Sequence, residues 1–333
     1  MIFTTISDMP SDLQVYLDRE LLRNMYARTI HDKWAQTRPV PMNMGQKIQF
    51  DQATPLAVST TPLTEGTPPT GKKYTQSRIF ATLAQYGDFI PYTDWVDMTA
   101  LSPVLVRLSG VLGPQGGQTY DILVRNTMIT GTNVRYANGV AGRTSIVTAV
   151  SLADIQKAIL GIEQSNGEYI TEMNTAGPNV GTQPLDACFV GITHVDAKPT
   201  YRALEGFIKV EEYASQKDRM PGEFGSIEQV RLVATTNAKI WADGGGSAVA
   251  AGLVYTTANS ACDVYTTLIL SKEAYGVIPL QKKNIQNVVK KIGSAGSSDP
   301  LNQYGTSGWK MAMTGRILQD ALMCRIEHGV TAL

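Results

Sequence analysis

The segment 54–74 constrains the fold more than any other part of the chain. Its sequence, TPLAVSTTPLTEGTPPTGKKY, contains four prolines and six threonines. Proline restricts the backbone and removes a hydrogen-bond donor, and the segment lacks the apolar stripe at helical spacing that would bury one face of a helix. It is also much longer than an ordinary hairpin connection. The sequence therefore predicts an extended arm that cannot pack on the chain's own core.

Segments with the pattern of strands flank this arm on both sides. In 46–52, Ile48 and Phe50 alternate with Lys47 and Gln49, and a second strand is predicted for 76–86. The two strands and the arm together predict a long β-hairpin, assigned to residues 46–95. We expect its connecting segment to become ordered on meeting a partner.

The composition points to a surface that is largely covered. Charged residues make up 17% of the 333 residues, against a usual share of about 25%. Basic and acidic residues balance, 29 to 29, which excludes the basic footprint of a dedicated nucleic-acid-binding protein.

The chain is predicted to fold in a reducing cytoplasm and to have no membrane segment. Residues 1–13 lack the basic and apolar regions of a signal peptide, and no run of about 18 apolar residues occurs. Cys188, Cys262 and Cys324 are far apart in the sequence, without a paired motif, and are expected to be buried thiols.

Residues 1–45 are predicted to form an N-terminal arm. Ser11 can cap a helix whose apolar positions recur every four residues, and two prolines in RPVPMNMG force extended backbone after it. The recurring positions are Leu13, Leu17, Leu21 and Met25. The alternative is an ordinary first helix of the domain.

The longest predicted helix covers 102–131. Ser102 and Pro103 match its first positions, and Gly131 ends it. Pro114 and the following glycine pair are expected to kink or loosen its middle.

The remainder of the chain predicts a mixed pattern without regular βαβ alternation, and hence an α+β fold. The expected elements are a strand at 144–150, a helix capped by Ser151, a strand at 185–192, a helix from Thr193 to about 206, a strand at 225–236, and later strands around 262–271, 284–293, 309–315 and 321–330.

A search for catalytic, metal and cofactor sites finds no converging set of groups, so no enzyme activity, metal or cofactor is expected. The three histidines are scattered: His31 is expected at a solvated helix end, His194 in a helix start and His328 near the last strand. The glycine runs lack the lysine of a phosphate-binding loop. The neighbouring carboxylates Asp88, Asp94 and Asp97 fit a capped, solvated turn better than an acid–base pair.

The order of arm, hairpin, long helix and α+β body resembles the Hong Kong 97 fold of tailed-phage major capsid proteins. Several stretches resemble the capsid-protein family typified by coliphage N-four. They are HDKWAQTRPVPMNMGQKIQF (31–50), TPLTEG and QYGDF within 61–100, GTNVRYANG (131–139), EFGSIEQVRLVATTNA (223–238) and GWKMAMTGRILQDALMCRIEHGV (308–330).

The resemblance implies a domain division and a function. The hairpin at 46–95 would be the E-loop, 96–186 and 301–333 a peripheral domain with the spine helix, and 187–300 an axial domain. The implied function is self-assembly into the icosahedral shell around a double-stranded DNA genome. The alternative is an encapsulin-type nanocompartment with the same fold.

The resemblance also implies contacts between copies of the chain. In the E-loop, the expected anchors are Leu56, Val58 and Leu63. Glu65 and Gly66 are expected to form the turn at the tip, and Lys72 and Lys73 lie beyond this turn. In the N-terminal arm, the expected contacts are Leu13, Leu17, Leu21, Met25 and Trp34.

Further partners follow from the family alone. They are other copies in hexamers and pentamers, a separate scaffolding protein, a portal, a decoration protein and packaged DNA bound without sequence specificity. The separate scaffolding protein is expected because the sequence begins directly with the arm. The implied location is the virion capsid, after synthesis in the bacterial cytoplasm.

Overall fold

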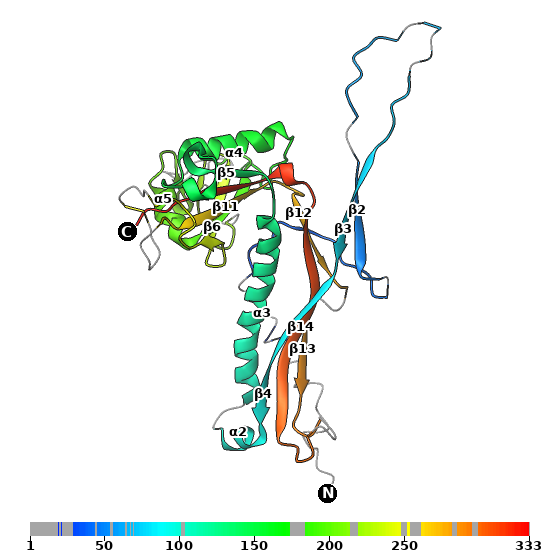
Figure 1. Cartoon of the computed structure of the whole chain (residues 1–333), viewed down its shortest axis with the longest axis vertical. Helices are drawn as coiled ribbons and strands as arrows, with labels where there is room; N and C mark the ends of the chain where they lie inside the picture. Colours follow the sequence, from blue (N-terminus) through cyan, green and yellow to red (C-terminus); the bar gives the residue numbers. More distant parts are fainter. Residues whose placement is uncertain are drawn as a thin grey trace.

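The fold has three parts: a body of helices and strands, a column formed by a long helix beside a narrow sheet, and a projecting hairpin (Figure 1). It is seen in a computed structural model. The described residues are 19, 21, 29–43, 45–53, 56–63, 65–66, 68, 70–100, 104–173, 184–213, 219–247, 252–253, 261–281, 285–294 and 299–332.

The first sheet is built around one long strand, β14, which pairs with β4 along one edge and with β12 and β13 along the other. Its members are β1 (Gln36–Thr37), β4 (Ala84–Thr93), β12 (Tyr275–Pro279), β13 (Ile285–Lys290) and β14 (Tyr304–Ile317). Thr93 ends β4 and caps the short helix α2 (Asp94–Thr99) by accepting from the Val96 N–H. The strand β1 pairs parallel to β12 and so joins the N-terminal part to this sheet.

The predicted hairpin is present. β2 (Lys47–Ala53) and β3 (Gln76–Thr82) pair antiparallel from Lys47 opposite Thr82 to Ala53 opposite Gln76. The predicted second strand, 76–86, is divided at Leu83, where β3 gives way to β4. The chain therefore leaves the hairpin and enters the first sheet directly.

The long helix α3 (Val104–Ile129) agrees with the predicted range but is continuous in the structure. Pro114 lies inside it, so the expected interruption does not break the helix. The proline ring crowds the carbonyl of the residue four positions earlier, which here is Gly110. α3 lies along the first sheet (Figure 1).

The second sheet lies in the body and carries β5, β15, β11, β6, β9, β8 and β7 in this order, with β10 beside β11. The bounds are β5 (Val134–Tyr136), β6 (Phe189–His194), β7 (Ile208–Lys209), β8 (Glu223–Ile227), β9 (Val230–Thr235), β10 (Ile240–Trp241), β11 (Val264–Leu270) and β15 (Met323–His328).

Helix α4 (Leu152–Gln164) begins where predicted. Ser151 accepts from the Asp154 N–H, and the Asp154 carboxylate accepts from the Ser151 N–H, which completes a capping box. Ile155, Ile159 and Ile162 form its buried face.

Three local predictions for the body were wrong. The segment 144–150 is not a strand, because its backbone bonds to the loop at Gly246 and Ile146 packs near Trp241. The predicted strand 225–236 is two strands, β8 and β9, joined by a turn in which Glu228 has a positive φ. Thr193 does not start a helix, because β6 continues through His194 in parallel pairing with β9, and α5 covers only Lys198–Arg202.

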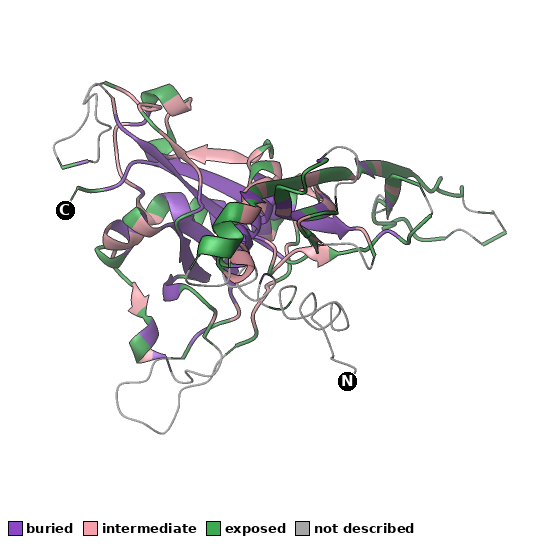
Figure 2. Cartoon of the chain, turned by 90° about the horizontal axis from the view of Figure 1, so that it is seen from below, coloured by how far each residue is buried: buried purple, intermediate pink, exposed green. Residues whose placement is uncertain are grey.

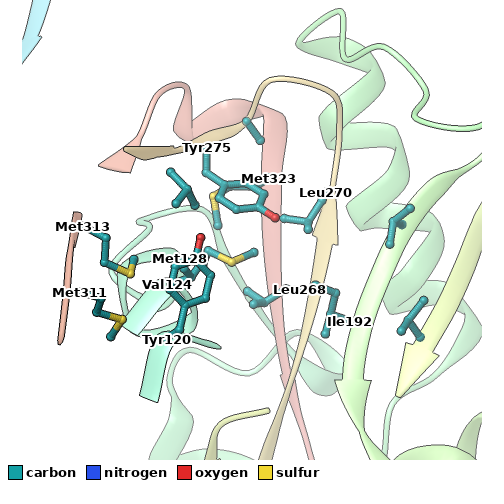
Figure 3. Packing of buried hydrophobic residues seen from close by; sticks show 14 of the residues in the cluster. Tyr120, Val124, Met128, Ile192, Leu268, Leu270, Tyr275, Met311, Met313 and Met323 are labelled. Carbon is teal, nitrogen blue, oxygen red and sulfur yellow. The ribbon is translucent and has the colours of Figure 1, made fainter. Parts of the chain in front are cut away.

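The main core joins both sheets to α3. Tyr120, Val124 and Met128 of α3 lie between Met311 of the first sheet and Leu268 of the second (Figure 3). A separate cluster under α4 fills the rest of the body. The two sheets therefore share a hydrophobic core.

Membership of the two sheets does not follow the residue ranges predicted for the peripheral and axial domains. β12 and β13 come from 187–300 but belong to the first sheet, and β15 comes from 301–333 but belongs to the second. The division into peripheral and axial domains stays a prediction, and its sequence limits do not coincide with sheet membership.

Candidate assembly surfaces

The arm beyond β2 and β3 projects from the rest of the chain (Figures 1 and 2). All described residues between 56 and 75 are exposed. Leu56, Val58 and Leu63 are 56%, 86% and 78% exposed. An isolated chain thus leaves these apolar side chains in water, although apolar surface gains free energy by burial.

The tip of the arm has the predicted turn. Glu65 and Gly66 lie in it, and Gly66 has a φ of 80°, in the left-handed region that glycine adopts without strain. Farther back, the Lys72 ammonium donates to the Ala57 carbonyl and so links the two sides of the arm. Lys73 is exposed.

The base of the arm is fixed to the first sheet by a small apolar cluster. It contains Val40, Phe50, Ala81 and Ile278. The Arg38 guanidinium lies 5.4 Å from the centre of the Phe50 ring, within the range of a cation–π contact. The root of the hairpin is therefore packed, whereas its distal part is exposed.

The predicted N-terminal contacts need a correction. Leu21 is fully buried in this chain's own core, and Trp34 packs against the same core. Leu21 has no surface left for a neighbour. Leu13, Leu17 and Met25 lie outside the described residues.

His31 also differs from its prediction, because it is fully buried instead of solvated. Its Nδ1 lies 2.9 Å from the Asp121 carboxylate of α3, which also accepts from the Ile30 and His31 N–H groups and from Asn237. Burial by itself raises the pKa of Asp121, but the interactions with His31, Ile30 and Asn237 together outweigh it, so this pKa lies below its usual value. The network joins the N-terminal part, α3 and the loop after β9.

Sequence reasoning missed an exposed apolar end of the first sheet. Phe89, Trp95, Met98 and Leu301 are 62%, 71%, 69% and 76% exposed. They occur near the end of β4, in α2 and just before β14, and β4 and β14 meet there through the pair Thr93–Tyr304. In the sequence, the run FIPYTDWVDM combines large apolar residues with carboxylates, and this composition could have indicated the exposed apolar surface.

The described residues contain neither a metal-binding cluster nor an exposed thiol. They contain no group of three or more His, Cys, Asp or Glu side chains that could hold a metal ion. The three cysteines are buried, as predicted, and burial raises the pKa of each thiol to about 11, which leaves little reactive thiolate. No helix in the described part is long and apolar enough to span a bilayer.

Comparison with solved structures identifies the architecture. The capsid of Ralstonia phage GP4 superposes with a TM-score of 0.63 over 89% of this chain and 87% of that one, at 13% identity. The capsid of Helicobacter pylori bacteriophage KHP30 gives 0.59 over 92% and 90%, at 10% identity. The chain has the Hong Kong 97-type capsid fold.

Sequence comparison agrees with this fold. The major capsid protein of Pseudomonas phage KPP21 is 25% identical over an alignment of 242 residues that covers 68% of this chain. The chain spans 60% of the length of that curated relative. No protein-family model matches the chain. In the capsid fold, the predicted E-loop corresponds to the hairpin of β2 and β3, and the spine helix corresponds to α3.

Proposed function

We propose that this chain is the major capsid protein of a tailed phage and assembles with copies of itself into an icosahedral shell around double-stranded DNA. The observation that carries the proposal is the exposed arm: a subunit of this fold presents three large apolar side chains at 56–63 that its own chain does not cover. The 25% identity to a protein named as a major capsid protein supports the same function. The role is structural and not catalytic.

The arm explains how such a shell is held together. Backbone groups of an extended segment can pair with another chain, and apolar side chains can enter hollows on its surface. Each contact can be weak because each subunit makes several of them at once. Leu56, Val58 and Leu63 are the proposed anchors. For the N-terminal arm, the proposed contacts are Leu13, Leu17 and Met25, which lie outside the described residues.

Several partners belong to the same proposal. Copies would meet in hexamers and pentamers, with a separate scaffolding protein, a portal and a decoration protein as further partners. Packaged DNA would be bound through scattered charges, since the net charge of the chain is zero. The shell would form in the bacterial cytoplasm. The encapsulin alternative is less favoured, because the curated relative is a phage capsid protein.

Assembly of the purified protein tests this function. The mass distribution and negative-stain images would be recorded over a range of concentrations, with and without co-expressed scaffolding protein from the same genome. Closed particles, rings or sheets of megadalton mass are expected. A persistent monomer or small oligomer under all these conditions would contradict the proposal.

A variant of the arm tests the observation behind it. Residues 56–63 would be replaced by glycine and serine at equal length, which keeps the reach of the arm but removes its side chains. The subunit should keep its circular-dichroism spectrum and lose assembly. Leu160→Ser on α4, which removes another exposed apolar side chain (53% exposed), serves as the control and should assemble.

A further inference from the structure

The first sheet has one covered and one open face. Side chains alternate along β14, so Trp309 and Met311 point toward α3, where the Trp309 indole donates to Gln115. Gly308 and Lys310 then belong to the opposite face. A hollow of about 590 Å³ lies across β4, β13 and β14, and its lining includes Phe89, Val288, Gly308, Lys290 and Lys310.

The centre of this hollow is an apolar socket, which we define as Phe89, Gly308 and Val288. The three residues are in register across the sheet, with Gly308 between the other two. Phe89 and Val288 are 62% and 41% exposed, so the apolar walls face solvent in the single chain. Position 308 has to be small, because a Cβ there would lie 2.6 Å from the Phe89 Cβ.

Two lysines stand on either side of the socket along the strands. Lys310 follows Gly308 by two residues, and Lys290 lies opposite Thr306, two residues before Gly308. Among the described residues, no carboxylate forms an ion pair with either lysine. The carboxylate of Asp88 is turned toward α3, because it accepts from the Gln115 side chain. The rim of the socket is therefore positively charged.

The tip of the arm has the complementary pattern. Leu63 is 78% exposed, and Glu65 is the single acidic residue between 54 and 75. Glu65 follows Leu63 by two positions, and Lys310 follows Gly308 by two positions. Two residues of chain span at most about 7 Å. An apolar side chain in the socket thus places the carboxylate within reach of a rim lysine.

We propose that the socket receives the arm tip of a second copy, with the Leu63 side chain between Phe89 and Val288 and the Glu65 carboxylate beside a rim lysine. The chain direction of the bound arm decides whether that lysine is Lys310 or Lys290. The inference deepens the proposed function and rests on it, because it requires assembly of identical copies. It names the surface that the arm binds.

Engineered disulfides test the pairing in the assembled protein. The native cysteines are buried. In the double variant Leu63→Cys/Val288→Cys, the two introduced cysteines are therefore the only exposed thiols. Oxidation of assembled particles should give covalent ladders of the subunit on a non-reducing gel. The control, Leu63→Cys with Leu160→Cys, should give at least tenfold less ladder.

Charge reversal distinguishes the two directions. Glu65→Lys should lower the yield of particles at least tenfold, and Lys310→Glu or Lys290→Glu, added to it, should restore the yield for one direction only. Particles that form without ladders, and whose yield is insensitive to Glu65→Lys, would overturn the socket but leave the capsid function intact. Failure of the unmodified protein to assemble would instead overturn the function itself.

Discussion

At the scale of single residues, the Asp121 carboxylate holds three distant parts of the chain together. It accepts four hydrogen bonds from Ile30, His31 and Asn237 while fully buried. The sequence alone could not indicate this network, because His31 and Asp121 are 90 residues apart and neither belongs to a motif. His31 was accordingly predicted to be solvated. A histidine's own neighbours in sequence say little about which helix will cover it.

Replacing this carboxylate should strongly destabilise the fold. In Asp121→Asn, one carboxylate oxygen becomes an NH₂ group that faces a donor, so a buried donor loses its acceptor. Losing buried hydrogen bonds to a carboxylate lowers the free energy of unfolding by about 3 kcal/mol. Urea unfolding measures the change. Asp97→Asn on exposed α2 is the control, and a similar loss in both variants would refute this role for Asp121.

The buried His328 predicts how stability depends on pH. Its Nδ1 donates to the Gly329 carbonyl at 2.8 Å, and burial lowers its pKa from 6.5 to about 4. Between pH 6.5 and 4 the unfolded chain binds a proton that the folded chain does not, so stability falls as the pH falls through this window. The loss from this residue is about 3 kcal/mol. Urea unfolding of His328→Gln should show a shallower decline over this range and an unchanged slope above pH 7; an unchanged decline would contradict the assignment.

At the scale of elements, local sequence was sufficient where an element depends on its own residues. The capping box of α4, the limits of α3 and the hairpin around the arm follow from caps, periodicity and prolines near in sequence. Local sequence predicted the wrong element where a contact with a distant residue determines the backbone conformation. The segment 144–150 has the alternation of a strand, yet the loop at Gly246 takes its hydrogen bonds.

The proline inside α3 gives a prediction for this element. Pro114 removes a backbone N–H from the helix interior, so Pro114→Ala can restore the bond to the carbonyl of Gly110. The free energy of unfolding should rise by about 1–3 kcal/mol. Pro199→Ala is the matched control, because Pro199 is in the first turn of α5, where a proline is tolerated. Thermal and urea unfolding of both variants measure the difference, and equal effects would argue against a strained α3.

At the scale of the whole molecule, the pairing of strands was the part that sequence could not predict. Periodicity identified most strands but does not say which sheet each one joins. β14 and β15 follow one another closely, yet they belong to different sheets and to opposite sides of the shared core. The proposed assembly sites differ in the same way: the arm is one continuous run of unusual composition, whereas the socket combines β4 with β13 and β14, which follow it by about 200 residues in sequence.

The shared core predicts that the two sheets lose stability together. Met128 of α3 is fully buried between them (Figure 3), and Met128→Ala should lower the free energy of unfolding by about 3 kcal/mol. Hydrogen exchange followed by mass spectrometry should then show faster exchange in β11 and in β14 by the same factor. Phe50→Ala, in the separate cluster at the base of the arm, should accelerate exchange in β2 and β3 and leave both sheets protected. Loss of protection in β14 alone after Met128→Ala would mean that the column and the body are independent units, and the arm would then be attached to a part that can open without the rest.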